Sequence, residues 1–109
     1  MKTYVFDIDG TICTTTNGDY ENASPIQSRI NKINLLYEEG NKIIFNTARG
    51  MGRYGNAADL AFAAFYDLTI KQLANWGIKY HYLFMGKPSG DYYIDDKGVS
   101  DEDFFNTRN

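Results

Sequence analysis

The sequence contains too few cysteines for a disulfide and no segment that would insert into a membrane. Among its 109 residues there is one cysteine, Cys13, so an internal disulfide cannot form and a reducing compartment is indicated. No apolar run is long enough to cross a membrane, and the N-terminal residues lack the basic and apolar regions of a signal peptide. We therefore expect a cytoplasmic protein with no membrane partner, in which Cys13 is a small, partly buried residue rather than a nucleophile.

An excess of positive charge is also lacking. Lysine and arginine together number 11, against 14 aspartate and glutamate residues, and the net charge is −3. This balance offers no basic surface that would attract nucleic acid. The sequence also lacks repeats, linkers and low-complexity segments, so residues 1–109 are expected to form a single domain around one core.

Two apolar segments separated by a helical pattern predict a strand–helix–strand unit. Residues 4–6 and 42–46 are typical of buried strands, because their apolar residues follow one another almost without interruption. Between them, Ser24 is expected to cap a helix that starts at Pro25, and Gly40 is expected to end it. Such a unit predicts an α/β architecture with a parallel pair of strands and a right-handed crossover.

The later part of the chain continues this pattern. A second helix is expected to run to about Trp76, followed by strands over residues 80–85 and 91–96 and by a short helix that Ser100 caps. A parallel connection normally needs a dozen or more residues, and the last two strands are separated by far fewer. Either the third strand is irregular, or residues 87–90 run back along the sheet edge without a helix.

A flap is expected after the first strand. Asn17 and Gly18 lie between threonine-rich and polar flanks, which is a strong signal for a β-hairpin. The flap would therefore stand next to the end of the first strand.

Two carboxylates end the first predicted strand. Asp7 and Asp9 are two residues apart, so their side chains share one face, and Gly10 lets the backbone turn sharply after them. Two like charges at the end of a buried strand are costly unless a cation lies between them. This pattern indicates a metal site or a phosphate-handling site. The alternative is a solvated turn that merely ends the strand.

Further polar residues follow the other predicted strands. Thr47 with Arg49, then Lys87, then Asp95 with Asp96 all lie at strand ends, where open α/β sheets bind their ligands. Four converging carboxylates would repel one another unless a divalent cation neutralised them, and oxygen ligands suit Mg²⁺. A threonine hydroxyl and a lysine ammonium suit the oxygens of a phosphoryl group.

These segments resemble, in order, the four motifs of the haloacid dehalogenase superfamily. The resemblance spans residues 4 to 97 and rests on Asp7-Ile8-Asp9-Gly10-Thr11, Thr47, Lys87 and Asp95-Asp96. It implies a Rossmann-like three-layer sandwich with a mostly parallel central sheet. No interval between the motifs is long enough for a cap domain, so the site should be open.

The resemblance also implies roles for these residues in a Mg²⁺-dependent phosphatase. Asp7 would be the nucleophile that forms an aspartyl-phosphate, and Asp9 the general acid and base. Thr47 and Lys87 would bind the transferring phosphoryl group. The implied Mg²⁺ ligands are Asp7, the backbone carbonyl of Asp9, Asp95 and, directly or indirectly, Asp96.

Substrate recognition would be left to the loops around an open site. We expect contacts to a small-molecule phosphomonoester from Thr11, Arg49, Arg53 and Tyr54, with a neighbouring subunit completing the site if the protein is a homo-oligomer. The narrower resemblance is to small capless proteins linked to capsule and lipopolysaccharide sugar synthesis. It implies a small phosphorylated sugar or polyol as substrate.

Three other classes of function share parts of this pattern. A receiver-type signalling domain also clusters Asp, Thr and Lys at strand ends, but it carries its phosphorylated aspartate on the third strand, whereas the carboxylate pairs here come first and last. A non-catalytic Mg²⁺- or phosphosugar-binding subunit would have no need for Asp9 as a general acid. A phosphomutase would need a cap.

Overall fold

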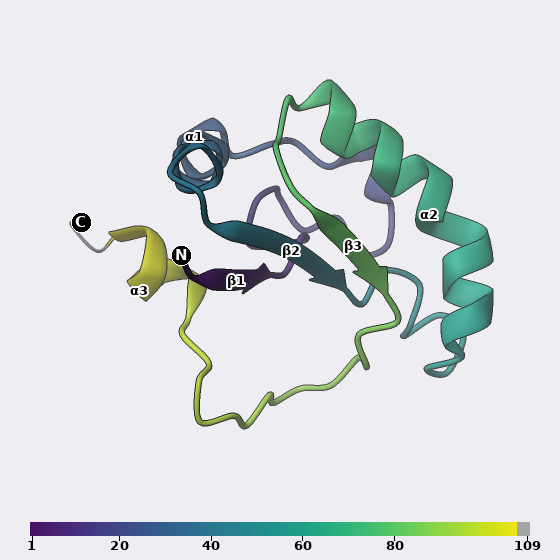
Figure 1. The fold of residues 1–109 in the computed structure, drawn as a ribbon. Helices are drawn as coiled ribbons and strands as arrows, with labels where there is room; N and C mark the ends of the chain where they lie inside the picture. Colours follow the sequence, from purple (N-terminus) through teal and green to yellow (C-terminus); the bar gives the residue numbers. More distant parts are fainter. Residues whose placement is uncertain (107–109) are drawn as a thin grey trace.

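The structure, a computed structural model, describes residues 1–106 and is built on a three-stranded parallel sheet. The strands are β1 (Thr3–Phe6), β2 (Lys42–Thr47) and β3 (Tyr82–Met85), in the order β1-β2-β3. Helix α1 (Gln27–Glu38) connects β1 to β2, and α2 (Ala58–Asn75) connects β2 to β3 (Figure 1). The predicted α/β class, with a parallel sheet and no cap, is confirmed.

The core lies on one face of this sheet. Alternate residues of the strands, such as Phe6 and Phe45, are buried against α1 and α2. The other members of this buried cluster are Ile8, Ile12, Cys13, Ile30, Ile33, Ile43, Leu73 and Ile78. Two right-handed crossovers that advance in the same direction along a sheet bring both helices to the same face. Both helices contribute to this cluster, so they form one layer.

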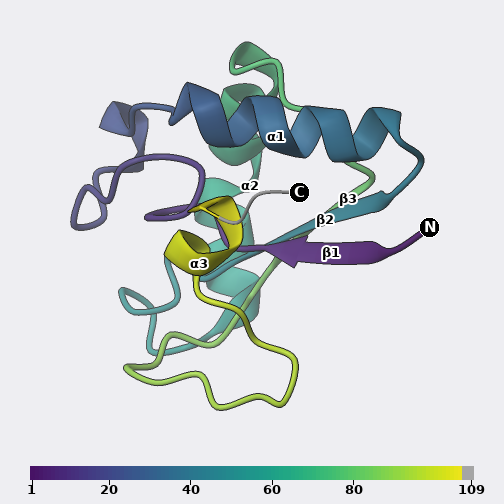
Figure 2. The same cartoon turned by 90° about the vertical axis from the view of Figure 1, so that its left-hand side faces the viewer.

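The opposite face of the sheet carries no helix among the described residues. Val5, Tyr82 and Phe84 project there and remain 61%, 51% and 54% exposed. Figure 2 shows α1 above the sheet and residues 86–100 below it. In this respect the described chain has two layers where a three-layer sandwich was expected.

The first helix starts later than predicted. Its N-cap is Ile26, not Ser24, and no side chain caps it. The cause is that Ile26 donates its backbone N–H to the carbonyl of Ile12 at 2.8 Å, while Pro25 pairs with Cys13 in an isolated bridge. Residues 24–26 are therefore held extended. The predicted end is confirmed, because Gly40 has a φ of 93° and Asn41 donates back to Leu36.

The predicted tight hairpin at Asn17 and Gly18 is wrong, although a wider flap is present. Asn17 and Gly18 do form a turn, with positive φ values of 54° and 92°. The chain just after this turn forms a short 3₁₀ helix, η1 (Tyr20–Asn22), and antiparallel pairing occurs only farther from the turn, between residues 12–14 and 24–26. The carbonyl of Tyr20 accepts a hydrogen bond of 2.6 Å from Gln72 Nε2 of α2, which draws the segment towards that helix instead.

The predicted fourth strand over residues 91–96 is also wrong. This segment is irregular and exposed, and Ile94 is 97% exposed. The chain after β3 is tied locally, because Ser89 donates to Asn56 Oδ1 and the Tyr93 hydroxyl donates to the carbonyl of Pro88. It then passes around the molecule to α3 (Asp101–Asn106) beside β1 (Figures 1 and 2). The connection is too short to return the chain to the sheet as a parallel strand.

The predicted final helix is confirmed, and it closes the edge of the core. Ser100 Oγ accepts a 3.2 Å hydrogen bond from the backbone of Asp103, as a helix cap does. Asp101 forms a 2.7 Å ion pair with Arg29 of α1. Phe104 and Phe105 pack against the ring of Phe6, with ring centroids 5.5 and 6.0 Å apart. A helix long and apolar enough to cross a membrane does not occur in residues 1–106.

Candidate active site

A cavity lies where β1 and β2 end. Its volume is about 300 Å³, and it is lined by Asp7, Asp9, Thr15, Thr16, Asn17, Gly18, Tyr20, Thr47, Ala48 and Arg49. The turn after β1 fixes the first two of these residues. Gly10 has a φ of 81°, its N–H donates to Cys13, and Thr11 and Ile12 both donate to the carbonyl of Ile8. Ile8 and Ile12 are fully buried, so the turn is anchored in the core.

The carboxylate of Asp7 is partly exposed at the cavity. Its side chain is 35% exposed, and Lys87 Nζ lies 3.7 Å from its Oδ2 atom. Lys87 is placed there by its backbone, which donates a 3.1 Å hydrogen bond to the carbonyl of Thr47. Burial raises the pKa of Asp7 above its usual value, and the neighbouring Asp9 adds to this, although Lys87 acts in the opposite direction. The structure thus brings Asp7, Thr47 and Lys87 together around a partly dehydrated carboxylate.

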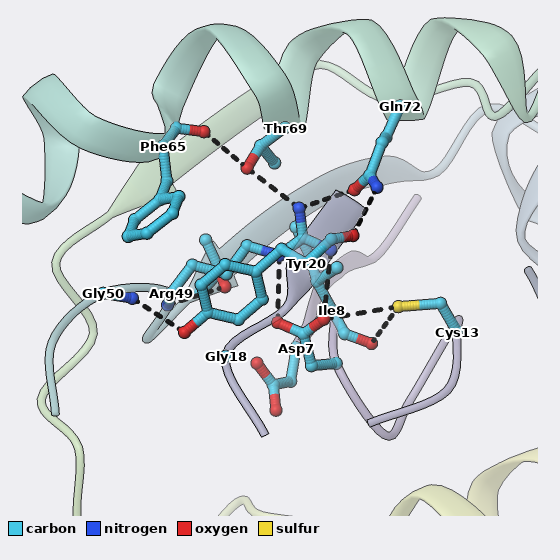
Figure 3. A network of polar contacts seen from close by, with 12 residues as sticks. Asp7, Ile8, Cys13, Gly18, Tyr20, Arg49, Gly50, Phe65, Thr69 and Gln72 are labelled. Carbon is cyan, nitrogen blue, oxygen red and sulfur yellow. Dashed lines mark hydrogen bonds and ion pairs between the residues drawn. The ribbon is translucent and has the colours of Figure 1, made fainter. Parts of the chain in front are cut away.

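Asp9 is held by Arg49 in a two-pronged ion pair. Arg49 Nε donates to Asp9 Oδ2 at 2.9 Å, and Nη2 donates to Asp9 Oδ1 at 3.0 Å. The remaining nitrogen, Nη1, donates to Thr69 Oγ1 at 3.1 Å and to Gln72 Oε1 at 2.6 Å, both on α2. The ring of Tyr20 lies 4.9 Å from the guanidinium carbon (Figure 3). Paired bonds of this kind fix both position and orientation.

The expected role of Arg49 as a substrate contact is therefore corrected. Arg49 is 1% exposed, and each guanidinium nitrogen already has a partner inside the protein. Its guanidinium is therefore bound to Asp9, Thr69 and Gln72. Figure 3 shows Arg49 enclosed between Tyr20, Thr69 and Gln72, with the carboxylate of Asp7 apart from this network.

A tight turn after β2 aims Arg49 inward. The backbone N–H of Arg49 donates to Thr47 Oγ1 at 3.2 Å, and that of Gly50 donates to the hydroxyl of Tyr20 at 2.9 Å. Gly50 has a φ of 78°, and a Cβ atom there would come within 2.7 Å of the ring of Phe65. Only glycine combines this backbone conformation with such close packing.

Other residues predicted for the site lie outside the cavity. Thr11 faces α1, where its carbonyl accepts a 3.0 Å hydrogen bond from Arg29. Arg53 lines a second cavity of about 420 Å³, while Tyr54 lines neither cavity. Asp95 and Asp96 lie on the exposed segment after β3.

The predicted convergence of four carboxylates is wrong in this structure, because Asp7 and Asp9 line the cavity whereas Asp95 and Asp96 do not. Within residues 1–106, no three His, Cys, Asp or Glu side chains are grouped so that they could hold a metal. Both oxygens of Asp9 accept from Arg49, and Oδ1 also lies 3.5 Å from the Cys13 sulfur. The carboxylate of Asp7 is not bound by Arg49, and because Mg²⁺ usually takes one or two carboxylates together with substrate phosphates and water, Asp7 is the side chain at this cavity that would hold it.

Cys13 is a buried packing residue and not a nucleophile, as expected. It is fully buried, and burial, together with the charge of Asp9, raises the pKa of its thiol to about 12. It therefore stays protonated at neutral pH, and a thiol rather than a thiolate is a poor nucleophile.

Sequence reasoning missed the residues that hold Arg49 and one that faces the cavity. Thr69 and Gln72 are polar residues on the otherwise apolar stripe of α2, and that interruption was the available signal. Tyr20 was hidden in the supposed hairpin. Thr16 lines the cavity, and its hydroxyl oxygen is buried without a hydrogen-bond partner in the described chain, which costs about 1–3 kcal/mol unless a ligand or water bonds to it.

The fold is thus a capless, Rossmann-like α/β fold with an open site at the carboxyl ends of its strands. No family model and no curated protein sequence matches the chain. A crystal structure of a target protein from Vibrio cholerae superposes with a TM-score of 0.90 at 26% identity, over 99% of this chain and 90% of that one.

Two further solved structures are similar at lower identity. The structure of the Pnkp1/Rnl/Hen1 complex matches with a TM-score of 0.61 at 19% identity, over 95% of this chain and 33% of that one. The D,D-heptose 1.7-bisphosphate phosphatase from B. bronchiseptica, solved with magnesium and phosphate, matches with a TM-score of 0.55 at 20% identity, over 91% of this chain and 54% of that one. This chain therefore spans a third of the first chain and about half of the second, and the likeness to both is one of fold.

The different surroundings of the two carboxylates predict opposite effects on stability. Because the pKa of Asp7 is raised on folding, its ionised form destabilises the native state at neutral pH. Asp7→Asn should increase the free energy of unfolding at pH 7 by less than about 1 kcal/mol, since the group is partly exposed. The gain should shrink as the pH falls through the raised pKa towards the ordinary value of 3.8. Denaturant unfolding in EDTA across this pH range measures it.

Asp9→Asn is the matched variant, and it should lower the free energy of unfolding by about 3 kcal/mol. The cause is that it leaves the buried charge of Arg49 without its counter-ion. Equal effects of Asp7→Asn and Asp9→Asn on the free energy of unfolding would contradict the different surroundings assigned to the two carboxylates.

Proposed function

We propose that this chain is a phosphomonoester hydrolase that acts through an aspartyl-phosphate on Asp7. The observation that carries the proposal is the contrast within one cavity. Asp7 has a free, partly dehydrated carboxylate next to the ammonium of Lys87, while Asp9 is immobilised by Arg49. Phosphoryl transfer depends mainly on positioning and on neutralising charge, and this arrangement provides both.

In the first step, an oxygen of Asp7 attacks the phosphorus atom and the bond from phosphorus to the leaving oxygen breaks. Lys87 offsets the charge of the phosphoryl oxygens, and Thr47 lines the cavity that contains Asp7. Asp9 gives its proton to the leaving oxygen. In the second step, water attacks phosphorus, the bond from phosphorus to Asp7 breaks, and Asp9 takes a proton from the water.

The contacts of Asp9 leave room for this exchange. A carboxylate oxygen has two lone pairs. Oδ1 accepts from Arg49 and from the thiol of Cys13, whereas Oδ2 accepts only from Arg49 Nε. The side chain is 21% exposed and lines the cavity. Oδ2 therefore has one lone pair with which to hold or receive a proton, and Arg49 is a positioning residue for that atom.

We further propose that the reaction requires Mg²⁺. The support is the resemblance of the sequence motifs and the magnesium in the similar heptose bisphosphate phosphatase. Since the described residues do not assemble a site for the ion, no step above is assigned to it. If Mg²⁺ binds with Asp95 and Asp96, the segment that carries them has to approach Asp7.

A small phosphorylated sugar or polyol is the proposed substrate, and surface-polysaccharide synthesis is the proposed setting. Both rest on the resemblance to small capless phosphatases. The open cavity supports them in one respect, because no cap restricts its entrance. Self-association stays a prediction.

Activity assays on an aryl phosphate, with Mg²⁺ and with EDTA, test the proposal. Asp7→Asn should abolish phosphate release, and Asp9→Asn should slow it by about 10²–10⁴-fold, as expected for a general acid and base. Lys87→Ala should lower kcat/KM through loss of charge next to Asp7. Asp67→Asn, an exposed carboxylate of α2 outside the cavity, is the control and should have no effect. Phosphate binding without turnover in the unmodified protein would instead favour a non-catalytic binding subunit.

The assignment of Arg49 makes a separate prediction. Lysine cannot reproduce the two-pronged contact, so Arg49→Lys should displace Asp9 and lower kcat by about 10²-fold. KM should be unchanged, and the loss should be equal for an aryl phosphate and a sugar phosphate, because Arg49 does not touch either. A rise in KM confined to the sugar phosphate would restore Arg49 as a substrate contact.

A further inference from the structure

A second cavity adjoins the site. It has a volume of about 420 Å³ and shares Asn17, Gly18 and Tyr20 with the cavity that contains Asp7. The two cavities therefore adjoin along the loop of residues 17–20. A molecule whose phosphate lies at Asp7 can extend into the second cavity, whose size is within the range of about 300–1,000 Å³ that is typical of small-molecule sites.

The walls of this second cavity are of two kinds. Phe65 and Leu68, from α2, provide an apolar surface. Asp19 and Glu21, near the 3₁₀ helix, provide carboxylates, and Arg53 provides a guanidinium. A hydroxyl group can both donate and accept hydrogen bonds, so a ring with hydroxyls on its edge and C–H groups on its face matches such walls.

The charges argue against a second phosphate. The two carboxylates outnumber the guanidinium of Arg53, which already lies 5.0 Å from the ring centre of Phe65 and donates to the carbonyl of Gly18 at 3.3 Å. An additional phosphate here would face a net negative wall. Like-charge contacts of this kind are a means by which sites reject wrong partners.

The aromatic rings argue against a nucleobase. One face of Phe65 is covered by Arg53, and one face of Tyr20 by Arg49 at 4.9 Å. The two rings also meet edge to face, with centroids 4.8 Å apart. Recognition of a base by stacking uses an open ring face.

We propose that the second cavity binds the leaving group of the substrate, and that it takes an uncharged polyhydroxylated group rather than one with a second phosphate or a nucleobase. This inference rests on the proposed phosphatase activity and narrows its substrate class to monophosphates of sugars or polyols. Under this inference, substrate specificity is set by Arg53, Leu68 and Glu21 and not by Arg49.

Kinetics with four probes test the inference. Acetyl phosphate has a leaving group too small to fill the second cavity, while glucose 6-phosphate, fructose 1,6-bisphosphate and AMP differ in the group that would enter it. We expect glucose 6-phosphate to have the highest kcat/KM of the three larger probes. Leu68→Trp, which fills the cavity, should lower the ratio of kcat/KM for glucose 6-phosphate to that for acetyl phosphate about tenfold.

A charge reversal tests the role of the acidic wall. Glu21→Lys should raise kcat/KM for fructose 1,6-bisphosphate relative to glucose 6-phosphate by about fivefold at low salt, and less at high salt. Asp67→Lys makes the same change of charge on α2 outside the cavity and should leave this ratio unaltered. Equal responses of all probes to Leu68→Trp, or equal effects of the two charge reversals, would overturn the inference.

A binding measurement separates this inference from the proposed function. In amide NMR spectra, glucose 6-phosphate should shift the signals of Arg53 and Leu68, whereas inorganic phosphate should shift only those near Asp7. If no probe is hydrolysed but this difference is seen, the phosphatase proposal fails and the leaving-group site stands. If both ligands shift the same signals, the leaving-group site is refuted even in an active enzyme.

Discussion

The ion pair between Arg49 and Asp9 is the interaction on which the candidate site depends. A buried guanidinium is costly unless each of its nitrogens is hydrogen-bonded and its charge is balanced. Here the partners come from three separate parts of the chain: Asp9 after β1, the ring of Tyr20 in the loop, and Thr69 with Gln72 on α2. One residue therefore fixes the loop and the helix relative to the end of the first strand.

This pair gives two neighbouring carboxylates different properties. Asp9 is charge-balanced by Arg49, whereas Asp7 is partly dehydrated, has a raised pKa and lies next to the more distant ammonium of Lys87. Separate environments of this kind are how enzymes assign different roles to two similar groups. A nucleophile benefits from a free carboxylate, and a general acid and base benefits from a fixed one. This geometry therefore suits the roles proposed for Asp7 as the nucleophile and for Asp9 as the general acid and base.

Much of the fold could be predicted from the sequence, because local signals and burial agree there. The apolar runs of β1 and β2, the glycine stop at Gly40 and the Ser100 cap depend on nearest neighbours. The predictions that were wrong concern segments whose structure depends on contacts with residues far away in the sequence. Ser24 lost its capping role because Ile26 bonds to Ile12, and the tight hairpin did not form because Tyr20 bonds to α2. The run Tyr92-Tyr93-Ile94, which ends in paired carboxylates, suggested a strand over 91–96. So short a connection cannot return the chain to the sheet as a parallel strand.

For the site, the sequence indicated four of the residues that gather, wrongly added Asp95 and Asp96, and did not indicate what each residue contacts. Asp7, Asp9, Thr47 and Lys87 follow strands and so meet at one edge. Whether Arg49 would turn outward to a ligand or inward to Asp9 depended on Gly50 and on two polar residues of α2, which no local pattern links to it.

Trapping of the covalent intermediate tests the central claim most directly. In the Asp9→Asn variant, an aryl phosphate still permits the first step, because its leaving group needs little protonation, while the attack of water lacks its base. Acid quenching during turnover, borohydride reduction and peptide mass spectrometry should then show homoserine in place of Asp7. Release of phosphate with Asp7 unmodified, or modification of another residue, would contradict the division of roles between the two aspartates.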